Sequence, residues 1–202
     1  MHPSFEPQPH ALPFRSMTAT PRLAELERAL ADLPPNVVGE IAFGRLVTQP
    51  RPAARHTFTA SRFGHVLGPP FQDGLGGPGG WMILNEPELQ LGPHVLVPDL
   101  AGWRVETMPS LPDVARLGIV PDWVCEVLSP STADFDRDEK MLIYGANGVG
   151  HLWLVDPVAR TIEAFRSARG RWTSIGTFGG DVVARLEPFD AISLTIATFF
   201  PR

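Results

Sequence analysis

The chain has 202 residues, 44% hydrophobic and 19% charged, which suits one globular domain with a sizeable core. Its formal net charge of −5 argues against a surface coated for nucleic acid, and its single cysteine, Cys125, excludes an internal disulfide or a multi-cysteine zinc site. No apolar run is long enough to span a membrane, and the N-terminus does not resemble a secretion signal. A cytoplasmic protein is therefore expected.

The N-terminal region predicts a leader followed by a helix. Residues 1–19 are rich in proline and are expected to form a disordered leader, which leaves a single folded domain over residues 20–202. Thr20 and Pro21 are typical of a helix start, and leucines recur at helical spacing until Pro34-Pro35 ends the pattern.

A hairpin and a second helix are predicted next. The run over residues 37–48 favours a hairpin that turns near Gly44. The following helix is expected from about Ala53 to Leu67, ending before Gly68 and two prolines.

The rest of the chain alternates between strands and one helix. A helix is expected to begin near Asp134 or Phe135 and to close at Asn147-Gly148. Strands are predicted over residues 81–84, 88–91, 95–103, 123–128 and 151–157, with a loop or short helix over 109–121, a hairpin of 161–166 with 171–177, and a tail of loop and short helix over 181–202. The order indicates a mixed α/β domain with an N-terminal helix and hairpin and a C-terminal β-hairpin.

The only lysine, Lys140, lies four residues before the only tyrosine, Tyr144, and every other residue in the Lys and Arg total is arginine. Lysine is a compact point charge whose pKa shifts readily, which suits it to a site beside a reacting water or phosphate. On the predicted helix Asp136, Lys140 and Tyr144 share one face. The alternative is a surface pair of Lys140 with Asp136, worth about 0.2–0.5 kcal/mol.

Two acids, Asp99 and Glu126, lie inside apolar runs. A buried carboxylate costs several kcal/mol unless it is paired or holds a metal ion. If the two strands pair with their faces aligned, both carboxylates converge near Lys140. One or two carboxylates with waters and phosphate oxygens are what Mg²⁺ prefers, so the pattern outlines metal-assisted phosphoryl transfer. A structural alternative treats both acids as satisfied core groups and predicts no metal site.

No acidic residue occurs from residue 41 to residue 72, although the whole chain is acidic. Local charge steers a ligand more than the total does, so this stretch is predicted to line the approach of a nucleic acid. An ordinary solvated face is the alternative. The candidate contacts are Arg51, Arg55, His56 and Arg62.

The motifs together resemble the Uma-two family of restriction endonucleases, within the PD-(D/E)XK nuclease superfamily. The specific part is Pro98-Asp99 with the block over residues 122–157, and a looser likeness covers the hairpin at Glu40 and the start of the second helix. The likeness spans about residues 20–200. It implies a restriction-endonuclease-like fold, with a central mixed β-sheet flanked by helices.

By this resemblance Asp99 and Glu126 bind Mg²⁺ or Mn²⁺, and the backbone carbonyl of Val127 completes the ligand set. The superfamily usually has a lysine two residues after the second acid, where this chain has Leu128. The resemblance places that role on Lys140 of the following helix.

The resemblance also assigns roles to three further residues, each with an alternative. Glu40 matches an N-terminal glutamate that contacts or supports the metal, or is an exposed hairpin acid. Tyr144 hydrogen-bonds a phosphate or Lys140, or is an aromatic at the core rim. His56 touches the scissile phosphate, or simply begins a helix.

The implied function is a metal-dependent endonuclease that hydrolyses phosphodiester bonds, with DNA as the favoured substrate. The alternative is a catalytically silent nuclease fold that binds nucleic acid or regulates. A homodimer is expected by analogy, because cutting two strands suits twofold symmetry.

Overall fold

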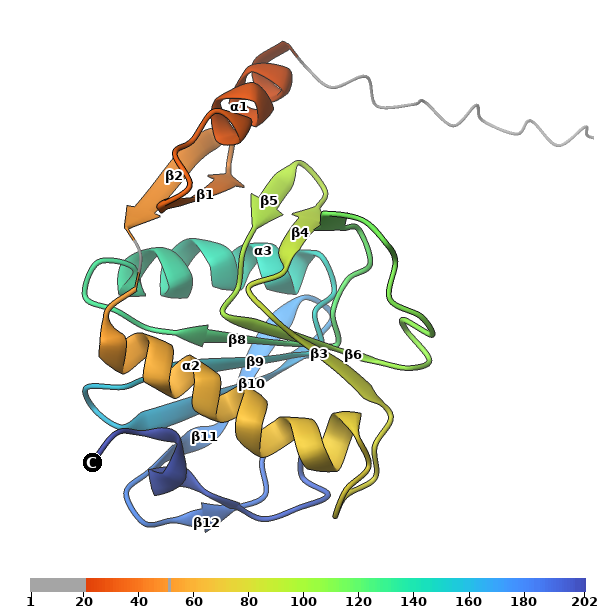
Figure 1. The fold of residues 1–202 in the computed structure, drawn as a ribbon, viewed down its shortest axis with the longest axis vertical. Helices are drawn as coiled ribbons and strands as arrows, with labels where there is room; N and C mark the ends of the chain where they lie inside the picture. The colour runs from red at the N-terminus through yellow and green to blue at the C-terminus, as the bar shows by residue number, and fades with distance from the viewer. Residues whose placement is uncertain (1–20, 51) are drawn as a thin grey trace, which may run out of the picture.

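The computed structural model describes residues 21–50 and 52–202 and shows an α/β fold with two main sheets (Figure 1). The predicted leader therefore lies outside the described residues. None of the described helices is long and apolar enough to cross a membrane.

The chain begins with helix α1 (Pro21–Ala31) and a hairpin of β1 (Val37–Ala42) and β2 (Arg45–Pro50), as predicted. The turn residues Phe43 and Gly44 have φ values of 48° and 72°, the positive values that a tight two-residue hairpin turn needs. Helix α1 packs closely on β1, because a Cβ added to Gly39 would lie 2.5 Å from Leu30 Cδ1.

The hairpin belongs to a five-stranded sheet of order β2-β1-β5-β4-β7. Its other strands are β4 (Glu88–Leu91), β5 (His94–Leu96) and β7 (Arg116–Leu117). Strand β7 is a short element inside the segment predicted as a loop or short helix, and it pairs in parallel with β4.

The second sheet has six strands in the order β11-β10-β9-β8-β6-β3, and β8 with β9 is its parallel pair. This confirms the mixed sheet. The strands are β3 (Trp81–Asn85), β6 (Leu100–Arg104), β8 (Trp123–Val127), β9 (His151–Asp156), β10 (Thr161–Ala168) and β11 (Arg171–Gly179).

The strand predicted over residues 95–103 was wrong as a single element. Strand β5 ends at Leu96 and β6 begins at Leu100, in the other sheet. Proline has no N–H for a sheet ladder, so Pro98 marks the break. The position of Asp99 is therefore set by β6, which begins at the next residue, and not by alternation along one strand with Val95. Because Leu100 pairs with Cys125 in the antiparallel β6–β8 register, Asp99 comes beside Glu126.

Two helices cover opposite faces of the six-stranded sheet (Figure 1). Helix α2 (Ala54–Leu67) was predicted to stop before Gly68, but the chain continues into a π-helical turn, η1 (Gly68–Gln72). Gly68 keeps a right-handed helical backbone with φ −56°, so it does not end the helix. On the other face a π-helix, η2 (Phe135–Lys140), runs directly into α3 (Met141–Ala146).

Each face of the sheet has its own core. The α2 side is filled by Phe63, Trp123, Trp153 and the C-terminal tail, which forms β12 (Val183–Ala184), β13 (Leu194–Thr195) and a 3₁₀ turn, η3 (Ile196–Phe199). Cys125 is buried there, as expected for a core residue. Alternation along β8 and the residue after it sends Val124 and Leu128 to the α3 side, where the core is otherwise apolar. Glu126 enters that side too.

Candidate active site

Lys140 lies at the centre of a buried cluster of carboxylates. Its side chain is 3% exposed, and its Nζ atom lies 2.8 Å from Glu126 Oε1, 3.0 Å from Glu40 Oε1 and 3.5 Å from Asp136 Oδ1. These partners come from β8, β1 and η2. A surface ion pair with Asp136 alone is therefore excluded.

These carboxylate partners stabilise the charged form of Lys140. Burial alone would lower the pKa of Lys140, but attraction to Glu126 and Glu40 outweighs it and raises the pKa well above its usual range. The lysine is consequently a fixed positive charge rather than a proton donor that titrates near neutrality.

The backbone around Lys140 is a π-helix where an ordinary α-helix was predicted. The N–H of Met141 donates to the carbonyl of Asp136, five residues earlier. Asp136 and Lys140 are both buried in this segment, and Tyr144 is buried in the α-helical turn that follows. Single π-helical turns occur often at functional sites.

Glu126 is held by Tyr144 as well as by Lys140. The Tyr144 hydroxyl donates to Glu126 Oε1 at 2.5 Å, and both side chains are buried. Burial and the nearby acids Asp136, Asp99 and Glu40 act to raise the pKa of Glu126, whereas the positive charge of Lys140 acts to lower it and favours the carboxylate. Tyr144 thus contacts Glu126, and the structure does not place it on a surface that faces nucleic acid.

We expect Tyr144→Phe to lower the free energy of unfolding by about 1.5–3 kcal/mol, the usual worth of a hydrogen bond to a charged group. Urea unfolding of the purified variant measures this. Trp172 provides a control, because its indole N–H donates to the neutral carbonyl of Met141. Removing that bond alone should cost only about 0.5–1.5 kcal/mol. Equal stability of Tyr144→Phe and the parent would mean that the hydroxyl contributes nothing to holding Glu126.

Glu40 is buried in the same cluster, so it is not an exposed hairpin acid. Its side chain is 1% exposed, Oε1 accepts the N–H of Val97 at 2.8 Å, and Oε2 accepts Gln49 Nε2 at 3.2 Å. Sequence reasoning missed Gln49. Glu40 pairs with Val47 in the β1–β2 register, so Gln49 is its diagonal neighbour on the adjacent strand. The predicted hairpin with its turn at Gly44 contained the signal for this contact, because the turn position fixes which residues face each other.

Asp99 joins the start of β6 to β8 and to α2. Its Oδ2 accepts the Val127 N–H at 2.7 Å, and its Oδ1 lies 3.2 Å from His56 Nε2 in the first turn of α2. Burial would lower the pKa of His56, but the bond to Asp99 and its charge, with the Val127 backbone, raise it overall. These contacts fix the carboxylate of Asp99 at the edge of the cluster.

A pocket of about 290 Å³ opens over these residues. It is lined by Glu40, His56, Asp99, Glu126, Val127 and Lys140, together with Asp136 and the turn over residues 129–132. A groove along the β3 side of α2 shares His56 and Asp99 with this pocket and carries Thr57, Ser61 and Asn85. The two acids, the lysine and the histidine singled out in the sequence thus meet at one cavity.

The basic residues predicted to contact nucleic acid do not all lie near this pocket. Arg55 is exposed in the first turn of α2, next to His56. Arg62 does not line the pocket; it lines a separate one beside Arg160. Arg51 lies outside the described residues.

The donor set at the pocket fits a hard divalent cation. Four carboxylates face two basic groups, Lys140 and His56, which leaves negative charge in excess when all are ionised. Within residues 21–50 and 52–202, no three His, Cys, Asp or Glu side chains are grouped to hold a metal ion by themselves. Mg²⁺ does not need such a group, because it keeps several waters and uses one or two carboxylates.

Comparisons with known proteins agree with the geometry. The Uma2 family model, described as "Putative restriction endonuclease", matches residues 23–197. The fold is similar to the crystal structure of a putative nuclease belonging to DUF820 from Anabaena variabilis ATCC 29413, with a TM-score of 0.67 and 21% sequence identity over 86% of this chain and 96% of that chain. No curated protein is significantly similar in sequence.

Proposed function

The chain belongs to the Uma2 family of restriction-endonuclease-like proteins, and we propose that it is an endonuclease that hydrolyses phosphodiester bonds in DNA with a divalent metal ion. One observation carries this proposal: the buried Lys140 is bonded to Glu126 at the floor of a pocket that Asp99 also lines. Two acids that can bind a metal ion and a lysine that can stabilise developing negative charge suit one cavity to metal-assisted phosphodiester hydrolysis.

Asp99, Glu126 and the carbonyl of Val127 would hold Mg²⁺ or Mn²⁺. When bound, such an ion polarises a phosphate and lowers the pKa of an attacking water. The bond from the Val127 N–H to Asp99 Oδ2 supports this set, because it keeps the carboxylate beside the residue whose own carbonyl would be the third donor.

Lys140 would steady the attacking water or the negative charge that develops on the phosphate. Its Nζ atom is held by Glu40, Glu126 and Asp136, so its position is set before substrate arrives. A charge that needs no reorganisation at the moment of reaction stabilises a transition state most effectively. Glu40 and Asp136 act through Lys140 and are positioning residues.

His56 and Arg55, side by side in the first turn of α2, would contact phosphates next to the scissile bond, and the predicted contact by Arg51 belongs to the same proposal. Tyr144 keeps Glu126 in place from behind the pocket. A cytoplasmic homodimer completes the proposal, since two such sites related by twofold symmetry would cut both strands.

A cleavage screen over single- and double-stranded DNA and RNA, with Mg²⁺ or Mn²⁺, tests the proposal. We expect cleavage of DNA that stops when a chelator is added and returns when the metal is restored in excess. A protein that binds these substrates equally well with and without chelator, and cleaves none of them, would instead be the silent nucleic-acid-binding module.

A further inference from the structure

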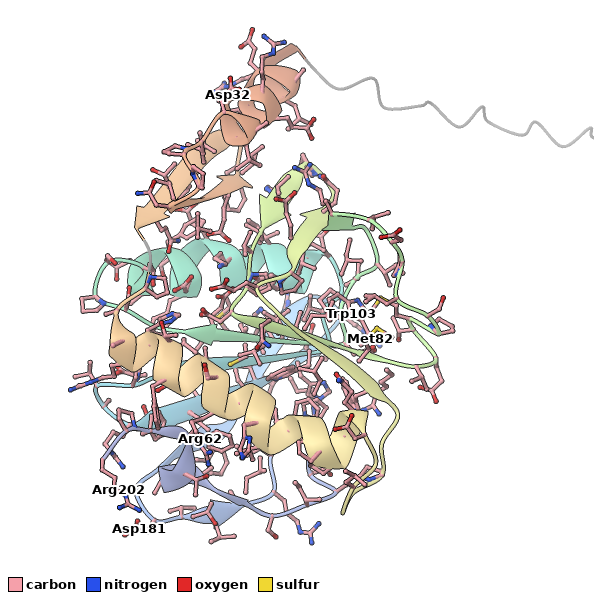
Figure 2. All side chains as sticks on the ribbon, in the orientation of Figure 1. Asp32, Arg62, Met82, Trp103, Asp181 and Arg202 are labelled. Carbon is pink, nitrogen blue, oxygen red and sulfur yellow. The ribbon has the colours of Figure 1, made fainter. Side chains whose placement is uncertain are left out.

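A separate pocket, which is basic, lies beside the middle of α2, near the C-terminal tail. It is lined by Arg62, Arg160 and Arg202, with Phe58 and Phe200, and none of its lining residues is acidic. We call it the arginine pocket. Figure 2 shows Arg62 on α2 and Arg202 at the tail.

Two of the three guanidinium groups of this pocket, those of Arg62 and Arg160, are held in place by groups that do not neutralise them. Arg62 Nε donates to the carbonyl of Thr198 at 3.0 Å, and Arg160 donates to the carbonyl of Pro201. A carbonyl accepts a hydrogen bond but leaves the positive charge intact. Within the described part of the chain, neither Arg62 nor Arg160 forms an ion pair, whereas Arg45, Arg116, Arg137 and Arg166 all pair with glutamates.

One acid lies close to this region in projection. Asp181 is drawn near Arg202 in Figure 2, but it does not line the arginine pocket. Across the described residues it has no ion pair with Arg202 either. Arg62 and Arg160 each donate one N–H to a tail carbonyl, so each keeps most of its five N–H donors for a ligand.

A flank of α2 connects the arginine pocket to the candidate active site. Arg55, Phe58 and Arg62 are spaced by three and four residues, so they lie on one side of the helix. Arg55 adjoins His56 of the active site, and Phe58 is 44% exposed. Seven helical residues span about 10.5 Å, the length of about three nucleotides along a duplex.

We propose that the arginine pocket binds a backbone phosphate of the nucleic acid about three nucleotides from the scissile bond. Guanidinium groups form paired hydrogen bonds with phosphate oxygens, which makes arginine well suited to this ligand. The exposed ring of Phe58, between Arg55 and Arg62, offers a surface against which a sugar or an unpaired base can pack. The position relative to the cut rests on the proposed function; the binding of phosphate does not.

The test measures binding of a fluorescently labelled DNA duplex in chelator, over a series of salt concentrations. The variant is Arg62→Gln with Arg160→Gln, because glutamine keeps an N–H donor for the tail carbonyls but removes the charge. We expect weaker binding and a salt slope that is smaller by about 0.9 for each lost phosphate contact.

Arg185→Gln is the matched control. Arg185 is exposed and also donates to main-chain carbonyls, those of Asp190 and Ala191, but it lies outside the arginine pocket. It should leave the slope unchanged. If the double variant unfolds, Arg202→Gln replaces it, because Arg202 is exposed at the end of the described chain.

Two results would overturn the inference: an unchanged slope in a folded variant, or an equal loss in the Arg185 control. Because the probe is bound without metal, this result is independent of cleavage. A reduced slope in a protein that never cleaves would support the arginine pocket and reject the proposed nuclease. Metal-dependent cleavage of DNA together with an unchanged salt slope would support the proposed nuclease and reject the arginine pocket.

Discussion

Lys140→Ala is expected to lower the single-turnover cleavage rate by about 10²–10³-fold, because the interaction is made chiefly in the transition state. The structure adds a second consequence. Glu40, Glu126 and Asp136 would lose their shared cation inside the protein, and breaking a buried pair in this way costs about 3–5 kcal/mol of stability. Cleavage should therefore be measured at a temperature where circular dichroism shows the variant to be folded.

Two further variants separate chemistry from stability. Lys140→Arg keeps the charge, but its planar fork is larger than the ammonium group and should rescue cleavage poorly in so closed a site. Arg137→Ala is the control. It removes a partly exposed cation of the same π-helix, which pairs with Glu163 on β10, and it should leave the cleavage rate unchanged. A folded Lys140→Ala protein that cleaves at the parental rate would remove Lys140 from the mechanism.

The sequence predicted which residues meet at the pocket better than it predicted the path of the chain that brings them together. The rarity of lysine and the two acids in apolar runs correctly indicated Lys140, Asp99 and Glu126 as neighbours at one pocket. Alternation along one strand did not explain Asp99, because Pro98 moves the chain from one sheet to the other. Which sheet a strand joins depends on contacts distant in sequence.

The local spacing of residues could not predict where helix α2 ends or which of its residues face the same pocket. Gly68 followed by two prolines is typical of a helix end, yet tertiary packing carries the chain on through η1. The acid-free stretch was predicted as one basic approach, but a helix sends successive residues to different sides. His56 consequently lies at the candidate site and Arg62 at the arginine pocket.

Glu126→Gln is expected to abolish the stabilisation that Mg²⁺ gives to the parent protein. A ligand at 100 times its dissociation constant stabilises a protein by about 2.7 kcal/mol, which corresponds to about 5–11 °C in Tm for a domain of this size. Glutamine has nearly the same shape as glutamate and can still accept the Tyr144 hydrogen bond, but it offers the metal no charge. Thermal unfolding with and without Mg²⁺ measures this without requiring cleavage.

The same variant should cleave DNA at a rate lower by at least about 10²-fold, because the metal supplies several kcal/mol of transition-state stabilisation. Glu163→Gln is its control: Glu163 is an acid on β10 that pairs with Arg137 and does not line the pocket, so both the Mg²⁺ shift and the rate should be retained. If the parent and Glu126→Gln respond equally to Mg²⁺, the metal lies elsewhere and Glu126 is only the partner that holds Lys140. Loss of the shift together with loss of cleavage would identify Glu126 as a ligand, since a residue that merely positioned the lysine would change the rate and leave the shift.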